Sequence, residues 1–138
     1  MSNRTFTIIK PDSVRKGNFG KIIDRLESEG FRVLGLKKVS LSQKQAESFY
    51  GVHRERPFFG DLVRYMTSGP VYVAALQRDG AVAHLRKVMG ATDPAKADAG
   101  TIRKDFGESI EQNAIHGSDS DENAKIEIGF FFAESELV

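Results

Sequence analysis

Along this chain, segments in which every second residue is apolar take turns with segments in which apolar residues recur at helical spacing. The order of these two kinds of segment constrains the fold more than any other feature. The first segment alternates with Phe6 and Ile8 on one face, which is the pattern of a half-buried strand. It ends at Lys10, because a residue that precedes a proline, here Pro11, favours an extended conformation. Three further segments are rich in apolar residues. The expected strands are residues 5–10, 31–40, 71–77 and 125–132.

Segments with helical spacing separate these strands. Apolar residues recur at helical spacing from Phe19 to Leu26, and Gly30 is a natural stop. Ser42 and Gln45 have the spacing of a capping box at the start of the next helix. The expected helices cover residues 19–26, 45–53, 58–66 and 82–89, and residues 119–124 are expected to form a capped helical turn.

The resulting order is strand, helix, strand, helical insert, strand, helix, loop, strand. It predicts an α+β fold of the ferredoxin-like type: a split βαβ sandwich with a four-stranded antiparallel sheet and an added helical hairpin. Residues 90–113 contain three glycines, one proline and little periodicity. A segment this long and irregular is usually functional, so we expect a long active-site loop. We expect residues 1–138 to form one domain.

Composition argues against several classes of protein. The chain carries 20 Lys and Arg against 19 Asp and Glu, a net charge of +1, so its overall field favours neither nucleic acid nor a membrane surface. It has no cysteine, which excludes disulfides, thiolate catalysis and cysteine metal sites. The sequence shows no apolar leader and no long apolar run. We therefore expect a cytoplasmic protein with no membrane association and no specific nucleic-acid partner.

One histidine lies among small and hydrogen-bonding residues, in the segment Asn-Ala-Ile-His-Gly-Ser-Asp at positions 113–119. Because an imidazole has a reference pKa of about 6.5, His116 can act as a neutral nucleophile near neutral pH. Gly117 would let the backbone approach a ligand, and Asn113 and Ser118 could hold a polar group. These features suit covalent phosphoryl transfer. From the residues alone, a solvated or capping histidine is the simpler interpretation.

Phosphoryl transfer requires positive charge and hydrogen-bond donors around the moving oxygens. By residue type the candidates are Lys10, Arg86, Arg103 and the hydroxyl of Thr92. The chain has neither a Gly-x-x-x-x-Gly-Lys-Ser/Thr nor a Gly-x-Gly-x-x-Gly motif, so a P-loop kinase or a dinucleotide-binding protein is not supported. Taken singly, the basic residues could be ordinary surface residues.

The segment 113–119 resembles the active-site signature of the nucleoside diphosphate kinase family, Asn-x-x-His-Gly-Ser-Asp. Further stretches resemble the same family in matching order and spacing, so the resemblance covers almost the whole chain. They are residues 9–12 (Ile-Lys-Pro-Asp), 56–59 (Arg-Pro-Phe-Phe), 68–70 (Ser-Gly-Pro), 90–94 (Gly-Ala-Thr-Asp-Pro), 100–103 (Gly-Thr-Ile-Arg), 105–106 (Asp-Phe) and 127–128 (Glu-Ile). The short segment after Phe132 is similar to bacterial members.

The resemblance implies an enzyme that moves the γ-phosphate of a nucleoside triphosphate, typically ATP, to a nucleoside diphosphate. The implied mechanism is ping-pong through a phosphohistidine on His116, with broad base specificity. The resemblance implies the same ferredoxin-like fold and a homo-oligomer, either a tetramer or a hexamer built from dimers.

The resemblance also implies a role for each matching residue. The implied catalytic residues are His116, Glu127 and Ser118 beside its ring, Lys10, and Tyr50. The implied substrate-binding residues are Arg86, Arg103 and Thr92 at the phosphates, Lys10 and Asn113 at the sugar hydroxyls and a phosphate, and Phe58 and Leu62 on either side of the base. Mg²⁺ is the implied cofactor and is carried by the nucleotide phosphates with no direct protein ligand. Asp12 and Asp119 are the nearby carboxylates, and Asp119 is the one expected to reach Mg²⁺ through water.

Four positions depart from the commoner family pattern without removing an implied catalytic group. They are Arg56, Lys104, Gln112 and Phe131. From the residues alone, two other classes stay open: a ferredoxin-like module that binds RNA or nucleotides without turnover, and a hydrolase in which water takes the phosphoryl group from the histidine. The near-neutral charge weighs against the first class. The lack of a water-activating acid or base other than Glu127 weighs against the second.

Overall fold

Four strands form one antiparallel sheet in the computed structural model, which describes residues 3–138. The strands are β1 (Arg4–Ile9), β2 (Arg32–Val39), β3 (Val71–Gln77) and β4 (Ile115–Gly117). Their order in the sheet is β2-β3-β1-β4, and each neighbouring pair is antiparallel. β3 therefore separates β1 from β2, and β1 separates β3 from β4. This interleaving is the split βαβ topology of the ferredoxin-like fold, which confirms the predicted fold class.

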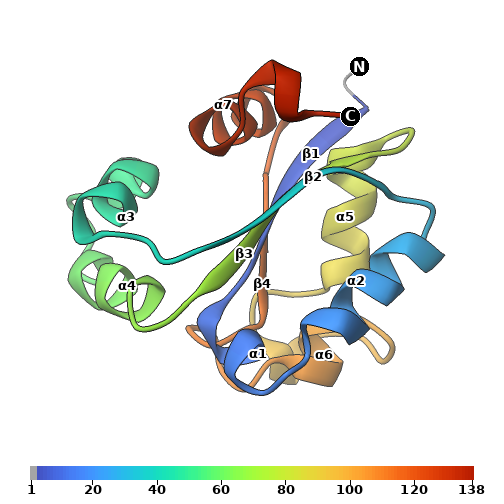
Figure 1. Ribbon diagram of the computed structural model, residues 1–138. Helices are drawn as coiled ribbons and strands as arrows, with labels where there is room; N and C mark the ends of the chain where they lie inside the picture. Colours follow the sequence, from blue (N-terminus) through green and yellow to red (C-terminus); the bar gives the residue numbers. More distant parts are fainter. Residues whose placement is uncertain (1–2) are drawn as a thin grey trace.

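Helices cover both faces of the sheet (Figure 1). They are α1 (Pro11–Arg15), α2 (Phe19–Ser28), α3 (Gln43–Phe49), α4 (Phe59–Met66), α5 (Ala81–Met89), α6 (Ile102–Phe106) and α7 (Asp121–Phe131). Short 3₁₀ helices lie at Gly51–His53, Pro94–Lys96 and Glu134–Glu136. Within residues 3–138, no helix has the length and apolar character needed to cross a membrane.

The sheet divides the buried apolar residues into two clusters. One lies between the sheet and helices α2, α5 and α6, and it includes Leu26, Leu85 and Ile102. The other lies between the opposite face and helices α3, α4 and α7, and it includes Met66 and Ile128. Adjacent residues of a strand point to opposite faces. The strand that carries the histidine therefore reaches both clusters.

The helices α3 and α4 form the added helical hairpin that the sequence predicts (Figure 1). The capping box at the start of α3 is present: the Ser42 hydroxyl accepts from the Gln45 N–H, and the Gln45 side chain accepts from the Ser42 N–H. The first three strands lie within one residue of their predicted bounds. The fold up to residue 89 therefore follows the predicted order closely.

The predicted strand at 125–132 is wrong, because these residues lie largely in helix α7. The helix begins where the Ser120 hydroxyl accepts from the Asn123 N–H, as the predicted capped turn requires, but it continues to Phe131. The alternation that suggested a strand does not mark a buried face, since Ile126 is 67% exposed and Phe130 is 38% exposed. The fourth strand is instead the short β4, which contains the histidine.

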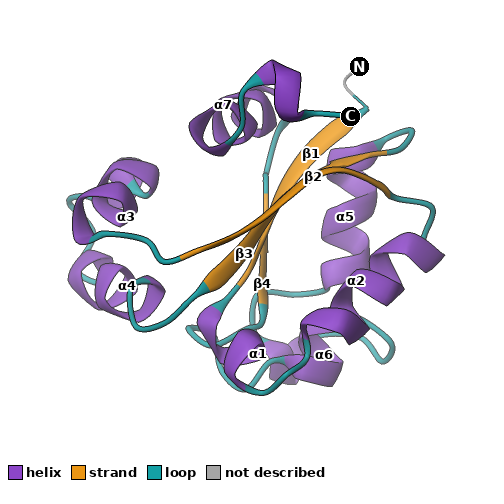
Figure 2. Cartoon of the chain, viewed as in Figure 1, coloured by secondary structure: helices purple, strands orange, loops and turns teal. Residues whose placement is uncertain are grey.

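The predicted loop at 90–113 contains structure that periodicity did not reveal. Helix α6 begins where the Thr101 hydroxyl accepts from the Lys104 N–H, and Pro94–Lys96 form a 3₁₀ turn. The remainder is irregular (Figure 2). Helix α1 was likewise not predicted, although Pro11 at its first position is favourable there. Both α1 and α6 are too short to show a helical repeat.

Candidate active site

His116 is the central residue of β4, at the edge of the sheet. It pairs with Ile8 of β1, and its carbonyl accepts a 2.7 Å hydrogen bond from the Thr7 hydroxyl. The imidazole side chain is 22% exposed, so the ring is anchored on one side and open to solvent on the other. A histidine in this position is available to a ligand.

Three aromatic rings surround the imidazole with their edges or faces inclined to it. Ring centroids lie 5.6 Å away for Phe49, 6.3 Å for Phe6 and 6.3 Å for Tyr50. The Tyr50 hydroxyl is buried and has no hydrogen-bond partner within residues 3–138. Burial, aided by the charge of Glu127, raises the pKa of Tyr50, so the hydroxyl stays protonated. The rings limit the orientations that the imidazole can adopt.

Glu127 of α7 fixes one nitrogen of the ring. Its Oε1 lies 2.9 Å from His116 Nε2 and also accepts a 2.7 Å hydrogen bond from the Ser118 hydroxyl. An ionised carboxylate oxygen only accepts hydrogen bonds, so Nε2 carries the proton in this arrangement. Nδ1 makes no hydrogen bond within the described part of the chain. The arrangement leaves a free lone pair on Nδ1.

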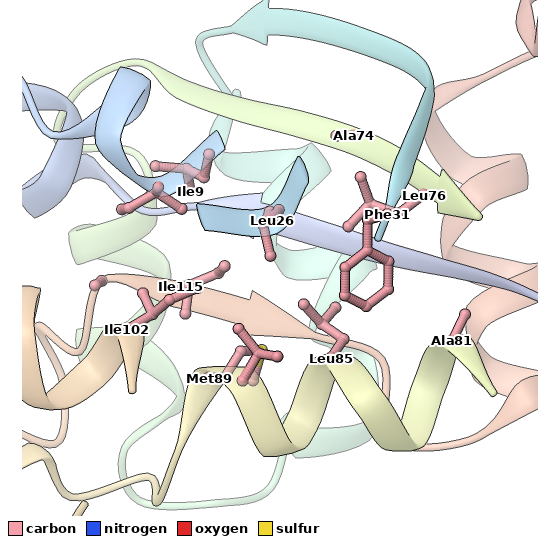
Figure 3. Packing of buried hydrophobic residues seen from close by; sticks show 13 residues of the cluster. Ile9, Leu26, Phe31, Ala74, Leu76, Ala81, Leu85, Met89, Ile102 and Ile115 are labelled. Atoms are coloured by element: carbon pink, nitrogen blue, oxygen red, sulfur yellow. The ribbon is translucent and has the colours of Figure 1, made fainter. Parts of the chain in front are cut away.

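Packing against α5 gives a reason for glycine at position 117 that the sequence did not show. A Cβ at this position would lie 2.6 Å from Met89 Sδ and 3.0 Å from Leu85 Cδ2. Figure 3 shows Leu85 and Met89 rising from α5 toward the strand that carries Ile115. Glycine thus lets the histidine strand lie close against α5.

The residue two places before the histidine has an unusual backbone. Ala114 has φ of 77° and is the one non-glycine residue with positive φ in the described chain 3–138. The Ile115 N–H donates to the Asn113 carbonyl at 2.9 Å, which closes a tight three-residue turn. The Lys10 N–H donates to the Ala114 carbonyl at 2.9 Å. The turn therefore connects the end of β1 to the start of β4.

Lys10, Arg103 and Arg86 form a cluster of positive charge. Burial and, second, the charge of Arg103 lower the pKa of Lys10 to about 8, while Asp12 and Glu111 oppose the shift. Burial and then Arg86 lower the pKa of Arg103 to about 10. None of the three cations makes an ion pair within residues 3–138. A cluster of cations without ion-paired carboxylates is suited to binding an anion.

Hydrogen bonds link two of these cations, Lys10 and Arg103, to the turn and to the long loop. Lys10 Nζ donates to Asn113 Oδ1 at 2.7 Å, and Asn113 Nδ2 donates to the Thr92 carbonyl at 3.0 Å. Arg103 donates to the carbonyls of Gly90 at 3.2 Å and Ile115 at 2.8 Å. Its Nε atom is buried and has no hydrogen-bond partner among residues 3–138. The predicted residues from three distant segments are thus connected.

The two carboxylates considered for a metal have different surroundings. Asp119 is exposed, and a hydrogen bond from Asn123 together with the charge of Arg86 lowers its pKa. Asp12 is 1% exposed and accepts from the Tyr65 hydroxyl and the Ala114 N–H. It is therefore occupied by protein donors. Within residues 3–138 no group of three or more His, Cys, Asp or Glu side chains is arranged to hold a metal ion.

Phe58 and Leu62 lie one helical turn apart at the start of α4. Phe58 is 47% exposed, and its ring lies 5.4 Å from that of His53. Leu62 is half-buried and, with Phe59, packs against the α3/α4/α7 cluster. Of the two adjacent phenylalanines, Phe58 is the ring left available for stacking. A separate cavity of about 590 Å³ lies beside α7, lined by Arg4, Ile128 and Phe132 among others, and contains none of the predicted site residues.

Sequence analysis missed Phe6, Phe49 and Tyr65, and it named Asp12 without predicting its contact. Phe6 and Phe49 face the imidazole, yet in the sequence they are simply apolar residues of a strand and a helix. Tyr65 and Asp12 meet through a hydrogen bond across 53 positions. No local pattern signals such a contact. Glu127 was placed correctly beside the histidine, although on a helix and not on a strand.

The fold and the site together define an α+β protein of the ferredoxin-like class, with a partly exposed histidine on a short strand whose Ile115 carbonyl accepts from Arg103, one of three clustered cations. A sequence model of the family described as "Nucleoside diphosphate kinase" matches residues 3–137. The chain belongs to the nucleoside diphosphate kinase family.

Individual relatives are similar over their full length. A nucleoside diphosphate kinase of Campylobacter jejuni subsp. jejuni serotype O:6 is 62% identical over 134 residues, which cover 97% of this chain and 98% of that protein. One from Rhizorhabdus wittichii is 61% identical and covers 99% and 98%. The crystal structure of the Aquifex aeolicus enzyme superposes with a TM-score of 0.96 at 45% identity, covering 99% of both chains. A Halobacterium salinarum enzyme in complex with CDP superposes with a TM-score of 0.95 at 40% identity, covering 100% of this chain and 92% of that one.

Proposed function

We propose that this chain transfers the γ-phosphate of a nucleoside triphosphate, typically ATP, to a nucleoside diphosphate, and that Nδ1 of His116 carries the phosphoryl group between them. One observation carries the proposal. Glu127, which also accepts a hydrogen bond from Ser118, lies against the protonated Nε2, and the free Nδ1 belongs to a partly exposed ring on the strand whose Ile115 carbonyl accepts from Arg103. A nucleophile with a lone pair and a neighbouring anion site is what the reaction requires.

In the first half-reaction, the Nδ1 lone pair forms a bond to the γ-phosphorus. The bond between that phosphorus and the β,γ-bridging oxygen breaks, and the electron pair leaves with the nucleoside diphosphate. The ring gains positive charge as the bond forms. The Glu127 carboxylate, 2.9 Å from Nε2, stabilises this charge, as a buried carboxylate does for a catalytic imidazole.

In the second half-reaction, a terminal oxygen of a new nucleoside diphosphate attacks the same phosphorus. The Nδ1–phosphorus bond breaks and its electron pair returns to the ring. Donor and acceptor use one site, so the cations meet the same phosphates in both directions. Lys10, Arg86 and Arg103 neutralise the phosphate oxygens, with the Thr92 hydroxyl as an additional donor. A unit charge at about 8 Å and an effective dielectric of about 20 contributes about 2 kcal/mol, so several cations together matter.

The nucleoside binds through weaker and less directional contacts. Asn113, next to Lys10, contacts the sugar hydroxyls or a phosphate, and Tyr50 restrains the histidine ring. The base lies between Phe58 and Leu62, and Phe58 is the exposed ring. Stacking on an aromatic face is tolerant of the base, which supports broad base specificity.

Mg²⁺ enters as part of the nucleotide complex. The described residues 3–138 hold no cluster of metal ligands, whereas the triphosphate supplies oxygens that Mg²⁺ prefers. Asp119 is exposed and ionised near Arg86, so it is the carboxylate that would contact a metal-bound water. Asp12 is unsuitable because it is buried and hydrogen-bonded.

The proposal extends to assembly and location. The 138 residues act as one domain, in a cytoplasmic homo-oligomer that is a tetramer or hexamer built from dimers. The strand β2, which lies at one edge of the sheet and carries the 44% exposed Leu36, suits contact between subunits. Sedimentation analysis checks the order of assembly.

A mass measurement tests the reaction. The protein is mixed with Mg-ATP, and its intact mass is read for an acid-labile phosphoryl adduct before and after GDP is added. We expect the adduct to form and then to move to GDP. Slow loss to water would indicate a hydrolase, and no adduct would indicate a binding module. The variant His116→Ala should form no adduct, and His84→Ala, whose histidine pairs with Glu29 elsewhere, should behave as the unmodified protein.

A further inference from the structure

Asp12 is a buried carboxylate without a place in the reaction proposed above. It lies at the start of α1, two residues after Lys10, and is 1% exposed. A carboxylate with this little solvent needs donors that keep it charged. Here the donors come from two distant segments, α4 and the turn before β4.

The first donor is Tyr65. Its hydroxyl donates to Asp12 Oδ1, and the Asp12 N–H donates back to the hydroxyl oxygen at 3.1 Å. This reciprocal pair fixes one carboxylate oxygen against helix α4. With Oδ1 fixed, the other carboxylate oxygen, Oδ2, is held in a defined orientation.

The second donor is the N–H of Ala114, which reaches Asp12 Oδ2 at 3.2 Å. Ala114 has φ of 77°, a conformation that costs a non-glycine residue on the order of 1–3 kcal/mol. It is fully buried, so water cannot bond its N–H if Asp12 does not. The carboxylate thus stabilises the backbone where it is strained.

This strained residue lies between two residues of the site. Asn113, before it, bonds Lys10 Nζ at 2.7 Å. His116 follows two residues later and enters the sheet opposite Ile8. A change in the Ala114 backbone would displace both the lysine partner and the nucleophile.

We propose that Asp12 is a positioning residue for phosphoryl transfer: anchored by Tyr65, it holds Ala114 in its strained turn and thereby fixes the places of Asn113 and His116. The inference rests on the proposed function and adds a residue that acts through the backbone, without touching the nucleotide.

The main test compares Asp12→Ala with Leu34→Ala, a control that destabilises the core of β2 away from the turn. For Asp12→Ala we expect the rate of phosphohistidine formation at saturating Mg-ATP to fall roughly 10- to 100-fold, because a buried N–H loses its partner. KM for ATP should stay within about threefold of its value in the unmodified protein, since the exposed Arg86 and the exposed ring of Phe58 remain in place. Asp12→Asn keeps a neutral acceptor and should lose less than Asp12→Ala.

A double-mutant cycle makes the test specific. Glycine adopts positive φ without strain, so in an Ala114→Gly background the loss caused by Asp12→Ala should shrink at least about threefold. If Asp12→Ala does not fold, the same cycle is measured with Asp12→Asn. Hydrogen exchange gives a measurement that does not depend on enzyme activity. Protection of the Ala114 amide from exchange should fall in both Asp12 variants.

Three results would overturn the inference: an equal loss of rate in Leu34→Ala at matched stability, a loss expressed only in KM, or an undiminished effect in the Ala114→Gly background. Failure of the proposed function looks different, because the unmodified protein would then form no adduct at all.

Discussion

The turn that holds the histidine and the tip of the α3–α4 hairpin meet different demands. In the turn, Asn113, Ala114, Gly117 and Ser118 are buried, and each is held by hydrogen bonds or close packing. At the hairpin tip, Val52 is 87% exposed and Phe58 is 47% exposed. In the proposed function, the half of the site that moves a phosphoryl group is held by many contacts, whereas the half that receives the base is exposed. Chemistry requires fixed geometry, and a tolerant base site does not.

The largest effect is expected from His116→Ala. Without the nucleophile, transfer between ATP and GDP should fall at least about 10⁴-fold, while thermal unfolding changes little because the ring is partly exposed. Steady-state transfer and circular dichroism measure the two quantities. Retention of most activity would show that another residue carries the phosphoryl group.

Glu127→Gln should have the next largest effect, with a loss of about 10²-fold or more. An amide can donate to Nε2, which would place the ring proton on Nδ1 and remove the nucleophilic lone pair. Nitrogen NMR of His116 distinguishes the two tautomers. An unchanged tautomer together with unchanged transfer would contradict the role given to Glu127, and Glu122→Gln on the exposed start of α7 is the matched control.

Phe58→Ala probes the exposed half of the site. Loss of base stacking, about 1–3 kcal/mol, should raise KM roughly 10-fold for every nucleotide while kcat changes little. A series of purine and pyrimidine diphosphates provides the measurement. A large fall in kcat with constant KM would contradict the assignment of phosphoryl transfer and base binding to different halves of the site.

The smallest effect is expected from pH. Because the pKa of Lys10 is lowered to about 8, its charge is present below pH 8 and is lost above it. Affinity for a diphosphate should fall severalfold between about pH 7.5 and pH 9, and Lys10→Gln should flatten this dependence.

The free energy of unfolding should depend on pH in the opposite direction. Above pH 8 the lysine binds more protons in the unfolded chain than in the folded one, so the contribution of Lys10 to stability rises with pH. Isothermal titration at a series of pH values checks the affinity, and denaturant unfolding checks the stability.

The parts of the molecule that sequence predicted are those with a repeat or a motif. The strands β1 and β3 and the helix α5 follow from periodicity. Of the residues that the motifs named, the structure brings Glu127 to His116 and Arg103 near Lys10. The strand β4 has three residues, too few to show alternation. In α7 some apolar residues lie on an exposed face. The sequence therefore showed alternation, which predicts a strand, in place of the helical spacing that would have predicted this helix.

Contacts between distant segments could not be predicted from local patterns. The bonds of Asp12 to Tyr65 and Ala114 cross 53 and 102 positions. The need for glycine at 117 depends on Met89 and Leu85, which only the packing of α5 brings there. Such features are set by tertiary structure and have no signature in neighbouring residues.

The position of β1 between β3 and β4 also determines when this protein can become active during synthesis. During synthesis the strand β1 must wait for residues 71–77 to pair along one side and for residues 115–117 to pair along the other. Glu127 emerges later still. A nascent chain that has not reached these residues therefore lacks both the closed sheet and the partner of the His116 ring.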